Sequence, residues 1–159
     1  MSKNEQRPGP GATQLELEFA DGTYVFALRL PQILELQRVC GAGIFEIYSR
    51  VMRGRMILAG ETLGVPHEAT AHARDVFDTV RLALIGGGGG TVDGERIEVD
   101  DLTARRLVEA YVHPPAPLKR GWDLAAAVLF ALVEGYQPAQ KKSQKEGGPV
   151  ASGSMTEPC

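Results

Sequence analysis

An alternating stretch near the N-terminus, TQLELEFADGTYVFALRL, constrains the fold more than any other feature. Successive side chains of a β-strand point to opposite faces, so apolar residues spaced by two give a strand with one apolar face. The Asp21-Gly22 pair in the middle accepts the positive φ angles of a tight hairpin turn. The stretch therefore predicts a β-hairpin whose apolar face the rest of the chain must cover. That face comprises Leu15, Leu17, Phe19, Tyr24, Phe26, Leu28 and Leu30.

Helical patterns follow the hairpin. Pro31 suits the first turn of a helix, which runs to Cys40 and ends at Gly41 or Gly43. Apolar residues recur at helical spacing between Ile44 and Met52, and again from about Thr70 to the glycine run. The segment RMIL leaves two alternatives open, the end of a helix or a strand.

Two further helices are expected in the C-terminal half. Asp100 or Asp101 is a candidate N-cap for LTARRLVEAYV, and Asp123 is one for LAAAVLFALVEG. These patterns together predict an α+β fold, with an N-terminal β-hairpin packed on a mostly helical body of four to five short helices.

Five consecutive glycines raise the question of a phosphate-binding loop. Such a loop needs a following lysine and a hydroxyl residue, and no lysine follows here. The glycines also follow a predicted helix and precede an extended segment around Asp93-Gly94, the reverse of a dinucleotide-binding turn. The run is therefore expected to stop the helix and to act as a hinge, formed by Gly86, Gly87, Gly88, Gly89 and Gly90.

Residue spacing does not indicate catalysis or metal binding. His67 and His72 are five residues apart, so they do not share a helical face. The adjacent Asp100 and Asp101 point apart, and Cys40 lies in an apolar pattern typical of a small buried side chain. We therefore predict no catalytic residue, no metal site and no cofactor. The function is expected to be non-enzymatic.

Composition narrows the partners and the compartment. The formal net charge is −3 and basic residues form no stripe, which disfavours nucleic acid. The ten apolar residues 124–133 fall short of the roughly 20 that cross a bilayer. Because the N-terminus is polar, we expect a cytoplasmic protein with a flexible leader at 1–12, a single domain at 13–136 and a disordered tail at 137–159.

The predicted helices carry more apolar surface than a body of this size is expected to hide. One interpretation is that these side chains pack on one another and on the hairpin. The other is that an exposed remainder forms a partner-binding groove. The candidate partner-binding residues are Ile44, Phe45, Tyr48, Met52, Trp122, Val128, Leu129 and Phe130.

The order of the segments resembles a known family. The hairpin LELEFADGTYVFALRLP, the helices ILELQRVCG and IFEIYSRVMRGR, the segment DVFDTVRLALIGGGGG and a remainder ending in AAAVLFALVEGY follow one another. This order is similar to that of the small tail-assembly proteins of gene transfer agents and siphophage-like prophages. The resemblance spans about residues 14–136, and its individual motifs are patterns of size and polarity.

The resemblance implies a tail assembly chaperone, a small cytoplasmic factor that keeps the tape measure protein soluble until tail tube proteins polymerise around it. Some relatives are labelled tail tube proteins, so the alternative is a structural, particle-associated component that self-associates. The family brings no catalytic residues. Its expected partners are the tape measure protein and tail tube proteins.

Overall fold

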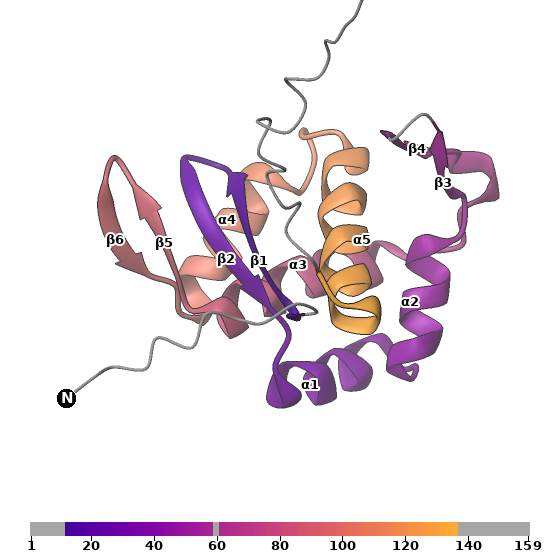
Figure 1. Ribbon diagram of the computed structural model, residues 1–159, viewed down its shortest axis with the longest axis horizontal. Coiled ribbons are helices and arrows are strands. Elements are labelled where there is room, and N and C mark those ends of the chain that lie inside the picture. Colours follow the sequence, from indigo (N-terminus) through magenta and orange to yellow (C-terminus); the bar gives the residue numbers. More distant parts are fainter. Residues whose placement is uncertain (1–11, 59–60, 137–159) are drawn as a thin grey trace, which may run out of the picture.

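The computed structural model describes residues 12–58 and 61–136 and confirms the α+β fold (Figure 1). A four-stranded antiparallel sheet lies at one end of the molecule, and helices cover one of its faces. The strand order is β1 (Gln14–Phe19), β2 (Gly22–Ala27), β5 (Gly89–Val92) and β6 (Glu95–Glu98), so β1 and β6 are the edge strands. Residues 1–11 of the leader predicted at 1–12, and the tail predicted at 137–159, lie outside the described residues.

The β1–β2 hairpin is confirmed, but its turn is one residue earlier than predicted. Phe19 pairs with Gly22, so Ala20 and Asp21 form the turn, and Ala20 takes the positive φ of 55°. Gly22 instead belongs to β2, where a Cβ atom would collide with the carbonyl oxygen of Thr91 on β5. This glycine is needed for close approach between strands and not for the turn.

Five α-helices and a small second sheet complete the fold of the described residues. Arg55–Leu58 is strand β3, which decides between the two alternatives left open for RMIL. It pairs antiparallel with β4 (Glu61–Gly64), and a short 3-10 helix, η1 (Pro66–Glu68), follows. The α-helices are α1 (Leu30–Cys40), α2 (Ile44–Met52), α3 (Ala73–Gly87), α4 (Asp101–Tyr111) and α5 (Leu118–Glu134).

The ends of α4 and α5 test the predicted caps. Asp100 is the N-cap of α4, since its Oδ1 accepts a hydrogen bond from the backbone N–H of Thr103 at 2.8 Å. The prediction that Asp123 caps the last helix is wrong. That helix begins about a turn and a half earlier, after Pro117, so Asp123 lies inside it and pairs with Lys119 at 2.9 Å. Leu30 likewise opens α1 and is exposed, instead of continuing the hairpin.

Helix α3 is the centre of the packing. It contacts β2 on the sheet and α1, α4 and α5 around it. Its buried residues include Val80, Ala83 and Leu84, none of which is exposed to solvent. The predicted amphipathic helix is thus covered on several sides, which explains how so short a chain encloses a single hydrophobic core.

The glycine run ends α3, as predicted. Gly86 and Gly87 form its last turn, and Gly88 is the C-cap with a left-handed φ of 73°. Gly89 and Gly90 already belong to β5, which pairs with β2 and, through a hairpin turn at Asp93-Gly94, with β6. The run therefore joins the central helix directly to the sheet. Its action as a hinge stays a prediction.

Candidate partner-binding groove

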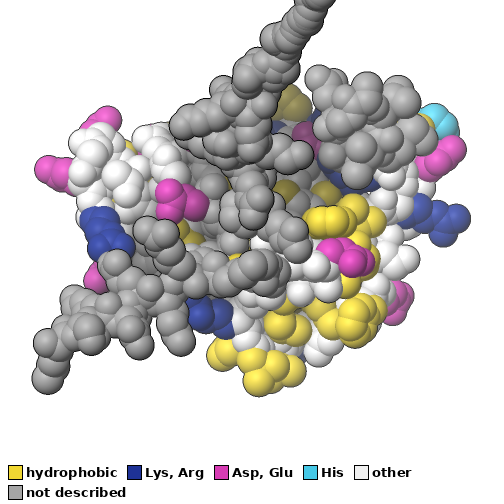
Figure 2. All heavy atoms as spheres, viewed as in Figure 1, with side chains coloured by type: hydrophobic (Ala, Val, Ile, Leu, Met, Phe, Trp, Pro, Cys, Tyr) yellow, Lys and Arg dark blue, Asp and Glu magenta, His cyan; other side chains and the backbone are white. Residues whose placement is uncertain are grey.

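A groove lies between the edge strand β1 and helix α5, and we call it the β1–α5 groove. It encloses about 580 Å³. On the face shown in Figure 2, hydrophobic side chains gather over α1, α2 and α5. The groove is lined by Leu15, Leu17, Met52, Arg55, Asp123, Ala126, Ala127, Phe130, Ala131 and Tyr136.

Small and large side chains on α5 give the groove its shape. Ala127 and Ala131 lie one turn apart on the helix and leave space in front of it. Phe130 stands at the rim, and 45% of its surface is exposed. On the opposite wall, Leu15 and Leu17 of β1 point to the helical side of the sheet, because they are spaced by two. The groove is therefore an apolar slot with an aromatic side chain at its rim.

One end of the groove carries a charged pair. The side chain of Arg55 is only 4% exposed, and its Nη1 lies 2.7 Å from Oδ1 of Asp123. The Arg55 guanidinium also stacks over the ring of Trp122, 4.8 Å from its centroid. Within the described part of the chain, Nε of Arg55 has no hydrogen-bond partner. This N–H is buried, so a partner would reach it only if the Arg55 side chain moved.

The structure separates the eight candidate partner-binding residues into three groups. Trp122, Val128 and Leu129 lie in the core, with at most 8% of each exposed. Phe45 and Phe130 are exposed. The half-buried ones are Ile44, Tyr48 and Met52. In this conformation the second and third groups are accessible at the surface, and of these Met52 and Phe130 line the groove.

Sequence reasoning missed several groove residues. Leu15 and Leu17 were assigned to the hidden face of the hairpin, and Arg55 lay in the segment whose secondary structure was ambiguous. The sequence does contain one signal for Arg55, a charged residue directly before the apolar triplet MIL. The alanines of α5 carry no such signal, because small residues are common in fully packed helices.

Cys40 and His113 lie in structural environments and not in a reactive site. Burial, followed by the nearby Asp75 carboxylate, raises the pKa of the Cys40 thiol to about 12, so the thiol stays protonated at neutral pH. The ring of His113 packs against that of Phe77, with 4.4 Å between the ring centroids. In residues 12–58 and 61–136, no three His, Cys, Asp or Glu side chains form a group that could hold a metal ion.

A second apolar area lies on the outer side of α1 and α2. Leu30 and Leu34 are one turn apart on α1, with 66% and 56% of their surfaces exposed. Phe45, at the start of α2, is 71% exposed. None of the described helices is both long enough and apolar enough to cross a bilayer. The exposure of Leu30, Leu34 and Phe45 makes these side chains further candidates for contact with a partner.

The fold and the groove define a small α+β protein with an apolar groove at its surface. Residues 12–64 match the family model described as "Phage tail tube protein, GTA-gp10". The match covers the β1–β2 hairpin, α1, α2 and the small second sheet, and it supports a relationship to a phage or gene transfer agent tail family. No curated protein and no solved structure is significantly similar to the chain.

Proposed function

We propose that this protein is a non-enzymatic tail assembly chaperone that binds the tape measure protein through the β1–α5 groove and assists assembly of the tail tube. The observation that carries the proposal is an apolar groove in a chain whose first third matches a phage tail family. Both walls contribute, β1 from inside the matched residues and α5 from outside them. The protein would act in the host cytoplasm or on the assembling particle.

The shape of the groove suits one apolar stripe of an amphipathic helix. Such a helix presents side chains at i, i+3, i+4 and i+7, and the alanines of α5 leave room for them. Phe130 and Met52 contribute larger contact surfaces at the rim.

A chaperone must also release its client. A single groove of this size buries less surface than a permanent complex, so tail tube proteins that offer more contact would displace it. A long tape measure protein would accordingly bind several chaperone molecules along its length, each weakly.

A hinge movement at the glycine run would require free energy, because it would expose buried side chains. Moving α4 and α5 about Gly86–Gly90 would widen the groove, but it would also separate α5 from α3 and expose Val80 and Leu129, both fully buried. Exposing a side chain of this size costs about 1.5–3 kcal/mol. A client would therefore have to supply comparable contacts before such a movement became favourable.

A structural component of the tail tube is the second candidate. The description of the matching family favours it, and so do the two edge strands of the sheet, which offer backbone groups for pairing with further subunits. A tube component assembles into rings or tubes on concentration, whereas a chaperone stays small without its client. Size-exclusion chromatography over a range of concentrations separates the two.

Co-expression with the tape measure protein of the same gene cluster tests the chaperone directly. The client should be soluble only when this protein is present. Phe130→Asp should reduce the soluble fraction, because it places a charge at the apolar rim. Leu102→Asp is the matched control, since Leu102 is 55% exposed on α4, away from the groove.

Thermal unfolding of both variants shows whether each remains folded. Equal client solubility with Phe130→Asp and Leu102→Asp would contradict the groove as the binding site. A tape measure protein that is soluble without this protein would contradict the chaperone function itself.

A further inference from the structure

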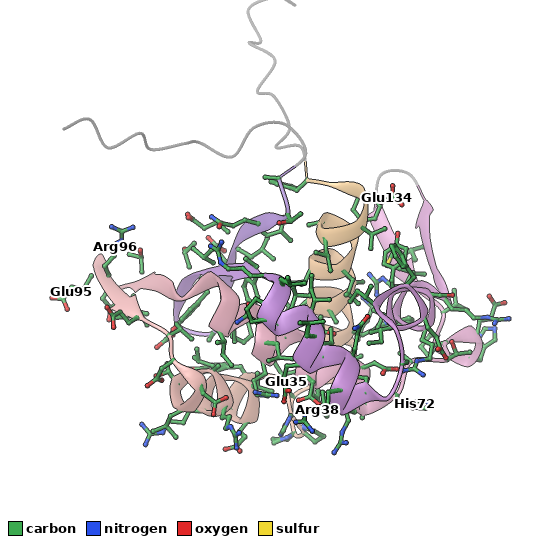
Figure 3. The ribbon with its side chains drawn as sticks, turned by 90° about the horizontal axis from the view of Figure 1, so that it is seen from below. Glu35, Arg38, His72, Glu95, Arg96 and Glu134 are labelled. Carbon is green, nitrogen blue, oxygen red and sulfur yellow. The ribbon has the colours of Figure 1, made fainter. Side chains whose placement is uncertain are left out.

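Strand β6 leaves one edge of the four-stranded sheet open. Within the described residues β5 is its only partner strand, and the β5–β6 hairpin projects from the body of the molecule (Figure 3). Glu95 and Arg96 lie at its far tip. Such an edge presents unpaired N–H and C=O groups that pair readily with another strand.

The backbone groups on the open edge belong to particular residues. The N–H of Val99 donates to the carbonyl of Gly88 at 3.0 Å, which continues the β5–β6 ladder by one residue. Backbone groups of successive residues alternate between the two sides of a strand. Arg96 and Glu98 therefore turn their N–H and C=O groups to the open edge, while Ile97 bonds to β5.

We propose that β6 is a homodimer interface, at which β6 of a second copy pairs antiparallel about a two-fold axis through Ile97. In this register Arg96 lies opposite Glu98 of the other copy, and the two-fold axis repeats the pair. Directly opposite residues share a face of the sheet, so two Arg–Glu ion pairs form on the outer face. Ile97, half-buried on the core side, meets its own counterpart.

Other registers of the same two strands are less favourable. A shift by one residue in one direction places Arg96 opposite Ile97 and Glu95 opposite Glu98. A shift by one residue in the other direction places Arg96 opposite Val99, and either one-residue shift sets a residue that bonds to β5 opposite one that bonds outward. A shift by two residues places either Arg96 opposite Arg96 or Glu98 opposite Glu98. Because like charges directly opposite one another are destabilising, the sequence Glu-Arg-Ile-Glu selects the Ile97-centred register.

The opposite edge of the sheet does not have this self-complementarity. β1 contains Glu16 and Glu18 and neither Lys nor Arg, so pairing β1 with another β1 brings carboxylates together. One end of that edge is also occupied, since Ala12 bridges to Tyr136. Pairing β1 with β6 of another copy offers at most one Arg–Glu pair, because Arg96 is the only cation on the two edge strands. The symmetric β6 pair is therefore the preferred contact.

Charge-reversal variants test this interface by sedimentation velocity over a concentration series. The natural chain should form a concentration-dependent dimer. Arg96→Glu should weaken dimerisation by about tenfold or more, because it turns two attractive pairs into two repulsive ones. The double variant Arg96→Glu with Glu98→Arg restores both pairs and should dimerise like the natural chain. Arg53→Glu, with the same change of charge at an exposed position outside the sheet, should leave dimerisation unchanged.

A cysteine at the two-fold axis gives a second, geometric measurement. In a background with Cys40→Ala and Cys159→Ser, Ile97→Cys should form an intermolecular disulfide on mild oxidation, whereas Thr91→Cys on β5 should not. A chain that stays monomeric at concentrations on the order of 1 mM would overturn the proposal. So would equal effects of Arg96→Glu and Arg53→Glu, no rescue by the double variant, or closed rings larger than a dimer.

Discussion

At the residue scale, Gly86 and Gly87 allow the last turn of α3 to lie directly against the sheet. A Cβ atom on Gly86 would collide with the carbonyl oxygen of Ala27, and one on Gly87 with the carbonyl oxygen of Val25. Both oxygens belong to β2, so the last turn of α3 lies directly against the strand. Backbone can approach this closely only where side chains are absent.

Gly86→Ala should therefore destabilise the protein by about 1–3 kcal/mol, the usual cost of an added group in a packed site. Urea unfolding followed by circular dichroism measures the change. Gly43→Ser is the control, since nothing lies within 4 Å of a Cβ atom there and the added side chain is larger. If Gly86→Ala is as stable as the natural chain, the residue is not held by packing and a hinge is favoured.

At the scale of elements, a buried ion pair joins α2 to α3. Nη2 of Arg50 lies 2.6 Å from Oδ1 of Asp75, whose side chain is 1% exposed. The other oxygen of Asp75 accepts the backbone N–H of His72 at 2.8 Å and so caps α3. One carboxylate thus fixes both the start of the central helix and the position of its neighbour.

Asp75→Ala should cost about 2 kcal/mol in the free energy of unfolding. This is less than the loss for a fully buried pair, because Arg50 is 18% exposed and keeps Glu46 at 3.5 Å. Thermal unfolding measures it. Glu35→Ala breaks an ion pair on the surface of α1 and should have little effect. If both variants lose the same free energy of unfolding, the Arg50–Asp75 pair stabilises the protein no more than a surface ion pair does.

At the scale of the whole molecule, residues that precede the glycine run pack against residues that follow it. Phe19 and Tyr24 of the hairpin pack edge to face at 5.8 Å, and Phe19 also meets Tyr111 of α4 at 6.1 Å. Trp122 of α5 donates a hydrogen bond from Nε1 to the carbonyl oxygen of Val51 in α2 at 2.7 Å. The two halves of the chain therefore share one hydrophobic core.

Unfolding should be a single cooperative transition. Trp122 is the only tryptophan, so its fluorescence reports the contact between α5 and α2, while far-ultraviolet circular dichroism reports all helices. The two urea curves should coincide. Separate midpoints would indicate two units joined at the glycines and would support the hinge.

The sequence by itself determined the local elements. Alternation defined the hairpin, helical spacing defined α1 to α3, and the Asp100-Asp101 pair marked the start of α4, since each of these signals depends on neighbours a few residues apart. Where two local signals overlapped, the predicted secondary structure was wrong, as at the start of α5, or left open, as at RMIL. Asp123 looked like a cap because the segment before it has a weak pattern, yet α5 begins at Leu118.

Only the tertiary structure decided which apolar surfaces stay exposed. Val128 and Phe130 are close neighbours on one apolar helix, but Val128 faces the core and Phe130 the rim of the groove. The groove also requires β1 and α5, which are about a hundred residues apart, to lie side by side. Burial depends on long-range contacts that local periodicity does not encode, and so does the pairing of Arg55 with Asp123. The physical reason is that a side chain's environment is set by whichever distant segment packs over it.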